Sequence, residues 1–357
     1  MKPSDSSSLL LNLPPGAEIL ILRLRSLGDL VLETPALAAL HSWRPDLKLA
    51  VLAEPWCAAV LEGNPDVSEI MLSRGFAATA SAIRRKKFAA VFNQHGGPRS
   101  AILTGLSGSP ARIGWSGYQY DFAYNVKVPD AWDFYGRAFV HAAEHRMSQF
   151  YFCGLPRGPV PRPRVFPRSD AVESVERMLK GKGIAPGARY ALLQPGARLP
   201  EMRWPVARFA ELAGWLRDAH QMAAVVNLGP GDDEVAREVH AGLHGIAVAA
   251  DSLDARQLIA LAAGSSIFVG NDSGPAHIAA AAGKPCVVIF GATNPAQWHP
   301  WQAEHRVIST GAEFRAVRGD KSVFIRSQRR ISEIPAGEVI EAAGELLRLP
   351  RNADSNL

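Results

Sequence analysis

The sequence predicts an α/β fold made of two units, each with its own parallel sheet. Its 357 residues correspond to two domains at roughly 150 residues per domain. In both halves, short apolar runs that end at glycine-containing turns alternate with segments of helical periodicity. The segment GLPRGPVPRPR at residues 154–164 separates the halves, and its proline and glycine content favours neither helix nor strand. Such alternation is typical of parallel sheets, so we expect a domain boundary near residue 160.

The composition is that of a folded globular protein. Apolar residues make up 47% of the chain and charged residues 20%, unlike the composition of a disordered chain. The net charge of +5 is a mild excess that suits an anionic ligand or a membrane surface better than a nucleic acid. Cys57, Cys153 and Cys286 lie far apart, so neither a disulfide framework nor a structural metal is indicated. No long apolar run and no secretory signal is recognisable, and we therefore expect a cytoplasmic protein that binds no nucleic acid.

The first unit is expected over residues 18–160, after a flexible leader at residues 1–17 that is rich in serine and proline. Its first apolar run is short enough for a buried strand, and the turn SLGD at residues 26–29 follows it. Leucine and alanine then recur at helical spacing, with a proline near the first turn. The expected elements are strands at 19–22, 48–53 and 89–93 and one helix at 30–41.

The second unit is expected over residues 187–335, after a linker and first helix at residues 161–186. The same alternation of apolar runs and helical segments restarts there. A final helix at residues 336–349 precedes a frayed tail at residues 350–357. The other expected elements are a helix at 170–182 and strands at 190–193, 223–228, 267–269 and 286–290.

The motif NDSGPAH at residues 271–277 is the strongest local signal. It follows an apolar strand and opens an alanine-rich helix. The N-terminus of a helix attracts anions through its N–H groups and its dipole, and the small residues Ser273 and Gly274 would let phosphate oxygens approach. An ordinary N-cap made by Asp272 or Ser273, with Pro275 in the first turn, explains the same residues equally well. Local features therefore leave both interpretations open.

Two further loops follow strands of the same unit. Residues 194–197 (QPGA) end one strand and precede RWP, which begins with Arg203. Open α/β sheets bind ligands at such a place, although an exposed turn with surface arginines is the simpler interpretation. The loop GPGDDE at residues 229–234 offers Asp232 or Asp233 to ribose hydroxyls. The motifs GxGxxG and GxxxxGK[ST] are missing from the sequence, which disfavours ordinary NAD or ATP chemistry.

Asp29 is the candidate for acid–base chemistry in the first unit. It follows the first strand beside Gly28, with Arg23 and Arg25 upstream, and a carboxylate there acts as a general base if it faces a ligand. Capping of the following helix explains Asp29 equally well. The pattern HxxEH at residues 141–145 is a zinc-binding pattern in other proteins, but no distal acidic ligand is evident. It predicts a solvated helix face and no metal site.

Three motifs taken together resemble one known family. SLGD after the first strand, PGA followed by RWP, and NDSGPAH resemble the ADP-heptose:lipopolysaccharide heptosyltransferases, glycosyltransferase family 9, over residues 18–348. The segments QHGGPRS at residues 94–100 and ARIGW at residues 111–115 are similar to the family's acceptor-side segments. The resemblance implies the GT-B fold, in which two Rossmann-like domains face a cleft. It places the acceptor on the N-terminal side and the nucleotide sugar on the C-terminal side.

The resemblance also implies an inverting transfer in which Asp29 is the catalytic base and the NDSGPAH motif holds the leaving diphosphate. One departure is Met202, because many members have a lysine two residues before the tryptophan. Arg203 or Arg198 would then supply the cation. The implied donor-binding residues are Gln194, Gly196, Ala197, Arg203, Asp232, Asp272, Ser273, Gly274 and His277, and the implied acceptor-binding residues are Arg25, Ser26, Gly28, Arg99 and Arg112.

The implied donor is ADP-heptose or another nucleoside-diphosphate sugar, and the implied acceptor is the inner core of lipopolysaccharide or another glycan. No cofactor and no divalent metal is expected. The basic cluster at residues 84–87 would contact acceptor phosphates or the inner leaflet of the cytoplasmic membrane, although a solvated basic face is the simpler explanation. Two other functions stay open. One is a GT-B nucleotide-sugar epimerase or hydrolase, and the other is a nucleotide-sugar-binding protein without transferase activity, for which Met202 is the only hint.

Overall fold

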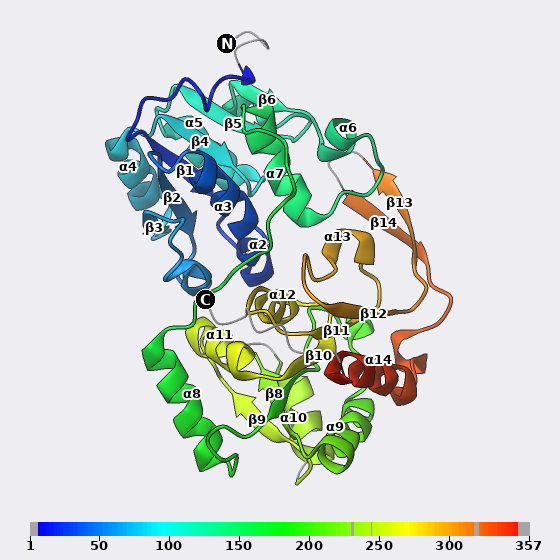
Figure 1. The fold of residues 1–357 in the computed structure, drawn as a ribbon. Coiled ribbons are helices and arrows are strands. Elements are labelled where there is room, and N and C mark those ends of the chain that lie inside the picture. The colour runs from blue at the N-terminus through cyan, green and yellow to red at the C-terminus, as the bar shows by residue number, and fades with distance from the viewer. Residues whose placement is uncertain (1–5, 230–231, 244, 318–320, 349–357) are drawn as a thin grey trace. The chain divides into compact units, whose positions relative to one another are not determined.

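The computed structural model describes residues 6–229, 232–243, 245–317 and 321–348. The chain separates into two compact units (Figure 1). One unit contains residues 1–163 together with 316–323, and the other contains residues 164–315 together with 324–357. Each unit holds a six-stranded sheet in which every described strand pair is parallel. The predicted α/β class is therefore confirmed.

The first sheet has the strand order β3-β2-β1-β4-β5-β6. The chain starts in the middle at β1, runs to one edge, returns to β4 beside β1 and then runs to the other edge. The carboxyl ends of β1 and β4 therefore flank the point where the chain reverses direction across the sheet, which is where open α/β sheets bind ligands. The strands are β1 (Glu18–Leu22), β2 (Lys48–Ala53), β3 (Glu69–Leu72), β4 (Ala90–Asn93), β5 (Ala111–Trp115) and β6 (Val126–Val128).

Helices cover both faces of the first sheet (Figure 1). The helix that the sequence predicts over residues 30–41 is in fact two, because the chain turns at Leu32 and restarts with Glu33 as N-cap and Pro35 in the first turn. Proline lacks the N–H that an uninterrupted helix would use there, so it fits the start of the second helix. The helices are α2 (Leu27–Val31), α3 (Thr34–Trp43), α4 (Phe76–Lys86), α5 (Pro98–Leu106), α6 (Ala131–Tyr135) and α7 (Ala142–Phe152).

The sequence predicts a flexible leader at residues 1–17, but the described residues of this segment pack onto the first unit. Leu9 and Leu10 are buried, and Leu10 N–H donates a hydrogen bond to the Cys153 carbonyl. The Arg44 guanidinium donates to the carbonyl oxygens of Leu10 and Leu13. Apolar burial and these hydrogen bonds hold the segment in place. Residues 1–5 of the leader, like the expected tail at 350–357, lie outside the described residues.

The second sheet repeats the topology of the first, with the order β12-β11-β10-β7-β8-β9. Here the chain reverses direction between β7 and β10. The strands are β7 (Tyr190–Gln194), β8 (Ala223–Leu228), β9 (Val248–Asp251), β10 (Ile267–Asn271), β11 (Cys286–Phe290) and β12 (His305–Ser309). The helices are α8 (Ser169–Gly181), α9 (Val206–His220), α10 (Asp233–Gly242), α11 (Ala255–Gly264), α12 (Gly274–Ala281), α13 (Pro295–Trp298) and α14 (Ala336–Arg348).

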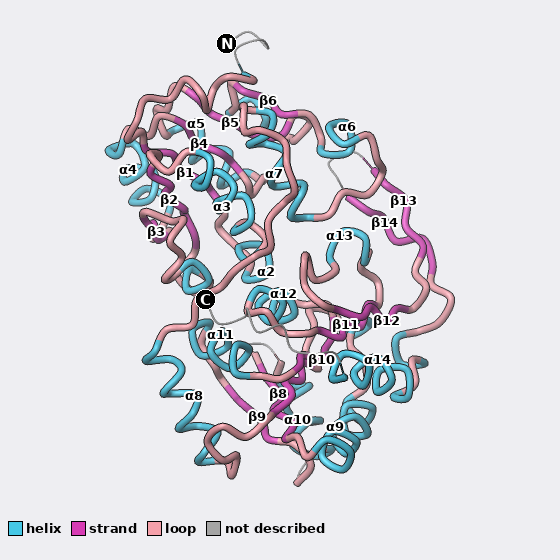
Figure 2. The backbone as a smooth tube through the Cα atoms, in the orientation of Figure 1, coloured by secondary structure: helices cyan, strands magenta, loops and turns pink. Residues whose placement is uncertain are grey.

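A two-stranded sheet, β13 (Glu313–Val317) and β14 (Lys321–Arg326), was not expected from the sequence (Figure 2). The cores of the two sheets consist of apolar side chains from the central strands, for example Leu20 and Leu22 in the first unit and Leu193 and Val226 in the second. Within the described ranges, no helix combines the length and the apolar character that crossing a bilayer requires.

Candidate functional site

Asp29 lies at the reversal point of the first sheet, on the short helix α2 directly after β1. Its Oδ2 accepts hydrogen bonds from the Ser26 hydroxyl at 3.0 Å and from the Ser26 N–H at 3.3 Å. The capping role that the sequence allowed for Asp29 therefore exists. The carboxylate is nevertheless 19% exposed, so capping does not remove it from contact with a ligand.

Two arginines hold the other oxygen of the Asp29 carboxylate. Arg23, which follows β1, places Nη2 2.5 Å from Oδ1, and its Nη1 donates to the Gln94 carbonyl after β4. Arg146 of α7 also pairs with Oδ1 through Nη2. The loop after β1, the loop after β4 and helix α7 are thus tied together around one carboxylate.

These charges determine the protonation state of Asp29. Burial by itself would raise the pKa of the carboxyl, but the two positive charges of Arg23 and Arg146 and the hydrogen bonds hold it well below its usual range. Nearby His95, directly after β4, has its pKa lowered to about 4 by burial and by the charges of Arg23 and Arg25. At neutral pH the group consequently contains an ionised Asp29 and a neutral His95.

Sequence reasoning missed two members of this group, Glu33 and Arg146. Glu33 is completely buried one helical turn after Asp29, with Oε2 3.6 Å from Arg146 Nε. Burial raises the pKa of Glu33 to about 7, against the lowering effect of the charges of Arg146 and Arg23. A glutamate four residues after Asp29 was visible in the sequence, but its partner on α7 was not.

The five predicted acceptor-side residues do not all gather at this edge. Gly28 belongs to α2, Ser26 is the N-cap of that helix, and exposed Arg25 precedes them. Arg99 of α5 reaches the same edge, where it bonds Glu54 Oε1 after β2 and Ser73 Oγ after β3, at 3.3 and 2.8 Å.

Arg112 points the other way. It lies near the amino end of β5, and its guanidinium donates to the carbonyl oxygens of Ser109 and Ala123, each at 3.0 Å. Both acceptors belong to the turns that flank the sheet, so Arg112 joins chain segments and is not brought to Asp29. The sequence could not separate the two arginines, because the direction of a side chain along a strand depends on its partners.

A hollow of about 680 Å³ lies at the carboxyl ends of β4 to β6. Gly96 forms one wall directly after His95, and a Cβ at this position would lie 2.8 Å from the Tyr118 ring, so a glycine is needed for the close approach. The wall offers aromatic rings and carboxylates, which bind sugar rings and hydroxyls respectively. Its polar and aromatic residues are Ser116, Tyr118, Gln119, Tyr120, Asp130 and Asp133.

In the second unit, Asn271 ties together the two loops at the reversal point. It is buried at the end of β10, and its Nδ2 donates to the Pro195 carbonyl after β7 at 2.7 Å. Its Oδ1 accepts the Trp204 N–H at 3.0 Å. Gln194 is fixed by a 2.6 Å hydrogen bond from Asn227 of β8. The QPGA and NDSGPAH loops, far apart in sequence, are therefore neighbours.

The first turn of α12 has no side-chain cap, although the sequence offered Asp272 and Ser273 for that role. The Ser273 hydroxyl donates instead to the Asn271 carbonyl at 3.0 Å. Burial raises the pKa of Asp272 to about 6. His277 is buried in the same helix, its ring 6.4 Å from that of Trp298. The N–H groups that begin α12 are thus not occupied by a capping side chain.

Asp232 covers the glycine of the QPGA loop. A Cβ at Gly196 would lie 2.4 Å from Asp232 Oδ2, which also accepts the Gly229 N–H at 2.9 Å. The neighbouring Asp233 is exposed on α10, so Asp232 is the carboxylate at this edge. The sequence left these two residues open as alternatives.

Arg203 reaches the same loop, where Nε donates to the Ala197 carbonyl at 3.1 Å and Nη1 pairs with Glu234. Met202 is buried at 7% exposure, with its Cα 3.3 Å from where a Cβ at Gly291 would lie. An apolar side chain therefore fits this position. Arg203 bonds the QPGA loop, and the other candidate cation, Arg198, directly follows the loop and is exposed.

The HxxEH pattern is used for structure. His141 is a buried N-cap whose Nδ1 accepts the Ala143 N–H at 3.1 Å, so the expected solvated face is wrong for this residue. Glu144 completes a capping box, and His145 stacks on Trp115 with ring centroids 4.1 Å apart. In the parts of the chain that the structure describes, no three His, Cys, Asp or Glu side chains are grouped as a metal site requires.

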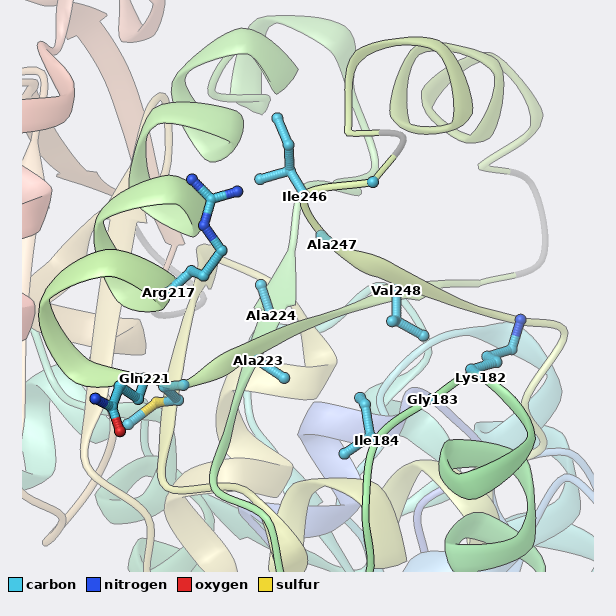
Figure 3. Close-up of a pocket in the computed structure, with 12 residues that line it drawn as sticks. Lys182, Gly183, Ile184, Arg217, Gln221, Ala223, Ala224, Ile246, Ala247 and Val248 are labelled. Carbon is cyan, nitrogen blue, oxygen red and sulfur yellow. The ribbon is translucent and has the colours of Figure 1, made fainter.

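Another hollow, of about 620 Å³, lies at the opposite edge of the second sheet (Figure 3). Its walls are the start of β8, the approach to β9 and the ends of α8 and α9. Ala223 and Ala224 form part of an apolar surface, and Lys182 and Arg217 lie on either side of it. Ligands of open α/β sheets bind at the carboxyl ends of the strands, whereas this hollow lies where β8 and β9 begin.

Comparison with known proteins identifies the family. Residues 76–322 match the family described as "Glycosyltransferase family 9 (heptosyltransferase)". The chain is 26% identical to lipopolysaccharide heptosyltransferase 3 of Escherichia coli over 343 residues, which covers 90% of this chain and 96% of that protein.

Solved structures agree on the fold. A family 9 glycosyl transferase from Veillonella parvula has a TM-score of 0.79 at 22% identity and covers 93% of this chain and 97% of its own. The E. coli ADP-heptose LPS heptosyltransferase II has a TM-score of 0.76 at 23% identity, with 92% and 98% covered. Both support the GT-B architecture expected from the sequence. The chain therefore belongs to glycosyltransferase family 9 and is a glycosyltransferase.

Proposed function

We propose that the protein transfers a heptose, or a related sugar, from an ADP-activated donor to the core of lipopolysaccharide or a similar glycan, with inversion at the anomeric carbon. Asp29 acts as the general base. The observation that carries this proposal is the ionised and partly exposed Asp29 carboxylate at the reversal point of the first sheet. The names of the relatives support the donor and acceptor classes. The family match begins at residue 76, so the role of Asp29 rests on its geometry.

The electrostatics of Asp29 determine when the proton moves. Arg23 and Arg146 make the carboxylate a weak base, so it does not deprotonate a resting sugar hydroxyl. As the hydroxyl oxygen attacks the anomeric carbon it becomes positively charged, and its proton becomes strongly acidic. Asp29 then accepts that proton late in the reaction, when even a weak base suffices. A carboxylate that stays ionised is available at every physiological pH.

The second unit is proposed to bind the donor. The uncapped N–H groups of α12 at Ser273 and Gly274 would hold the diphosphate, and the negative charge that grows on the leaving ADP would be stabilised there. Asp272 and His277 belong to the same motif, and Arg203 adds a positive charge at the QPGA loop. Because these groups supply the neutralisation, we propose that neither a divalent metal nor a cofactor is required. The remaining proposed donor contacts are Gln194, Gly196, Ala197 and, on the ribose, Asp232.

The first unit is proposed to bind the acceptor. Arg25, Ser26, Gly28 and Arg99 lie at the carboxyl edge of its sheet, and the hollow beside Gly96 offers room for a sugar ring. Arg112 is left out of this proposal because its guanidinium is bonded elsewhere.

A location at the inner leaflet of the cytoplasmic membrane is part of the same proposal. It is supported by the exposed basic residues at the end of α4, Arg84, Arg85 and Lys87, which match anionic headgroups. Lys86 is already paired with Glu69 and is the least available of the cluster.

The test is a mass-spectrometric transfer assay with ADP-heptose and deacylated lipopolysaccharide core, comparing the wild type with Asp29→Asn. We expect ADP release that depends on the acceptor and a heptosylated product, both lost in the variant. ADP release without acceptor would indicate a hydrolase, and an isomerised donor would indicate an epimerase. Donor binding with no product would indicate a binding protein.

Activity that survives removal of metal with EDTA is expected, and strict dependence on added Mg²⁺ would contradict metal independence.

A further inference from the structure

The charges around Asp29 extend into the interior of the first unit. Arg146 is 4% exposed and Glu33 is fully buried, and both lie behind Asp29. The Arg146 guanidinium is shared. Its Nη2 pairs with Asp29 Oδ1, while its Nε lies 3.4 Å from the Asp29 carbonyl oxygen and 3.6 Å from Glu33 Oε2. Arg23 completes a cluster of two arginines and two carboxylates.

Glu33 does not improve stability in any evident way. Neither of its carboxylate oxygens has a hydrogen-bond partner among the described residues, and its nearest positive charge is Arg146 at 3.6 Å. Burying an ionisable group under these conditions is costly, and a buried ion pair is weak evidence for stability. A fully buried glutamate directly behind a proposed catalytic carboxylate therefore requires another explanation.

The geometry provides one. Arg146 is held from behind by Glu33, and the backbone of α7 at Arg146 is fixed because its carbonyl accepts a 3.0 Å hydrogen bond from the Gln94 side chain. With Arg146 and Arg23 both on Oδ1, that oxygen is fully occupied. Oδ2 accepts its hydrogen bonds from exposed Ser26. One carboxylate oxygen thus serves as the anchor, and the other accepts the hydrogen bonds of Ser26.

We propose that Glu33 and Arg146 are positioning residues for the glycosyl transfer. The buried Glu33–Arg146 pair fixes the Asp29 carboxylate through Oδ1, so that Oδ2 receives the proton of the acceptor hydroxyl. This inference rests on the proposed function, because it presupposes Asp29 as the base. Glu33 and Arg146 touch neither donor nor acceptor, and their effect passes through Asp29.

The pair also adjusts the basicity of Asp29. The titratable groups that face Glu33 are Arg146 from α7, Arg23 after β1 and Asp29 on the preceding helix α2, and those facing Asp29 also include the neutral His95 after β4. Ionised Glu33 partly offsets the positive charge of Arg146 and so makes Asp29 a stronger base. Since the pKa of Glu33 is about 7, this contribution is present above pH 7 and is lost as the pH falls through that value.

The test compares Glu33→Gln, Arg146→Gln and the double variant with the wild type and Asp29→Asn in the transfer assay, from pH 5.5 to 8.5 in roughly half-unit steps. Arg306 and Glu345, a pair in the second unit at 2.6 Å, provide the control variant Glu345→Gln. For Glu33→Gln we expect kcat to fall about tenfold at pH 8, with the donor KM unchanged, because a small misplacement of a catalytic group costs that much or more. The difference from the wild type should shrink at pH 6, where the wild-type Glu33 is protonated.

Arg146→Gln should lower kcat throughout this pH range, since Asp29 Oδ1 loses the guanidinium that holds it. The double variant removes both buried charges, so its melting temperature should return toward that of the wild type while kcat stays low. A double variant with wild-type kcat, or a Glu33→Gln defect that is the same at pH 6 and pH 8, would show that the pair is only structural.

The two proposals fail separately in this experiment. If Asp29→Asn keeps full activity, Asp29 is not the base and the positioning inference is overturned together with it. If Asp29→Asn is inactive while Glu33→Gln and Arg146→Gln both match the wild type at every pH, the base assignment stands and the positioning inference alone is wrong.

Discussion

In the first unit, the central strand β1 is followed by a helix that carries a carboxylate between two arginines. In the second unit, β7 is followed by a glycine-containing loop that lies beside a helix without a side-chain cap. The strand order is the same in both units, and so is the edge at which the loops lie. The first edge is built from fixed full charges: Arg23, Asp29 and Arg146. The second edge also carries Arg203 and Asp232, but the contacts that join its loops come from amide groups, above all Gln194 and Asn271.

This difference indicates how one topology supports two tasks. A fixed ionised carboxylate suits proton transfer, because its position and charge do not change with pH. Neutral donors at a helix N-terminus suit the binding of a diphosphate, because they place partial positive charge on the anion without the cost of burying a cation. The point where the chain reverses direction determines where the candidate site lies in each sheet. The residues at that point determine which chemistry the site supports.

The largest effect on activity is expected when the carboxylate at the edge of the first sheet is removed. Asp29→Asn should lower kcat by about 10²–10⁴ and leave the donor Kd unchanged, because the general base is lost and the second unit is untouched. Measuring turnover at saturating donor together with donor binding by calorimetry checks both quantities. A variant that turns over normally but binds the donor poorly would reverse the assignment of the two units.

A smaller effect is expected at the QPGA loop. In Gly196→Ala the new Cβ would lie 2.4 Å from Asp232 Oδ2, so the carboxylate must move away. We expect donor binding to weaken about tenfold, equivalent to roughly 1.4 kcal/mol, with little change of kcat at saturating donor. Gly214→Ala is the matched control, since nothing lies within 4 Å of its added Cβ. Equal behaviour of the two variants would remove Asp232 from the donor site.

The pH dependence of donor binding is a further distinction. The pKa of Asp272 is raised to about 6, so this residue is neutral below that pH and negatively charged above it. A negative charge next to the diphosphate site disfavours the donor, and the donor Kd should therefore increase as the pH rises through 6, by at most about tenfold. Calorimetric titrations at pH 5 and pH 8 test this, and Asp272→Asn should show a flat profile. A wild-type Kd that does not change would place the Asp272 carboxylate away from the anion.

The sequence predicted the central strands better than the edges, for a physical reason. β1, β2, β7 and β11 are buried nearly throughout and appear as continuous apolar runs. The edge strands β3, β6, β9 and β12 are short or half-buried and lack that signal. β5 was missed because Arg112 and Gly114 interrupt its apolar pattern. A continuous apolar run indicates a strand that is buried on both faces. A strand that lacks such a run cannot be distinguished from a loop by its sequence.

The candidate site divides in a similar way. Asp29 and the NDSGPAH loop were identifiable because each follows an apolar strand directly, so their place at a sheet edge followed from local sequence. Glu33 and Arg146 were not, because their relation exists only once α7 packs beside α2 and β4. The capping roles that the sequence allowed for Asp29 and Ser273 depend on particular hydrogen bonds, which a sequence does not contain.

The smallest effect on activity is expected for Arg112, and it tests whether charge alone predicts a role. Arg112→Met removes two hydrogen bonds to the Ser109 and Ala123 carbonyls, and should cost about 1–3 kcal/mol of unfolding free energy while leaving the acceptor KM unchanged. Arg99→Met is the matched comparison. Arg99 is 41% exposed at the carboxyl edge, so its loss should raise the acceptor KM with little change in stability. Thermal unfolding and acceptor titration of both variants separate the two. An acceptor KM raised by Arg112→Met and not by Arg99→Met would mean that the acceptor occupies the amino-terminal side of β5, away from the edge at which open α/β sheets bind ligands.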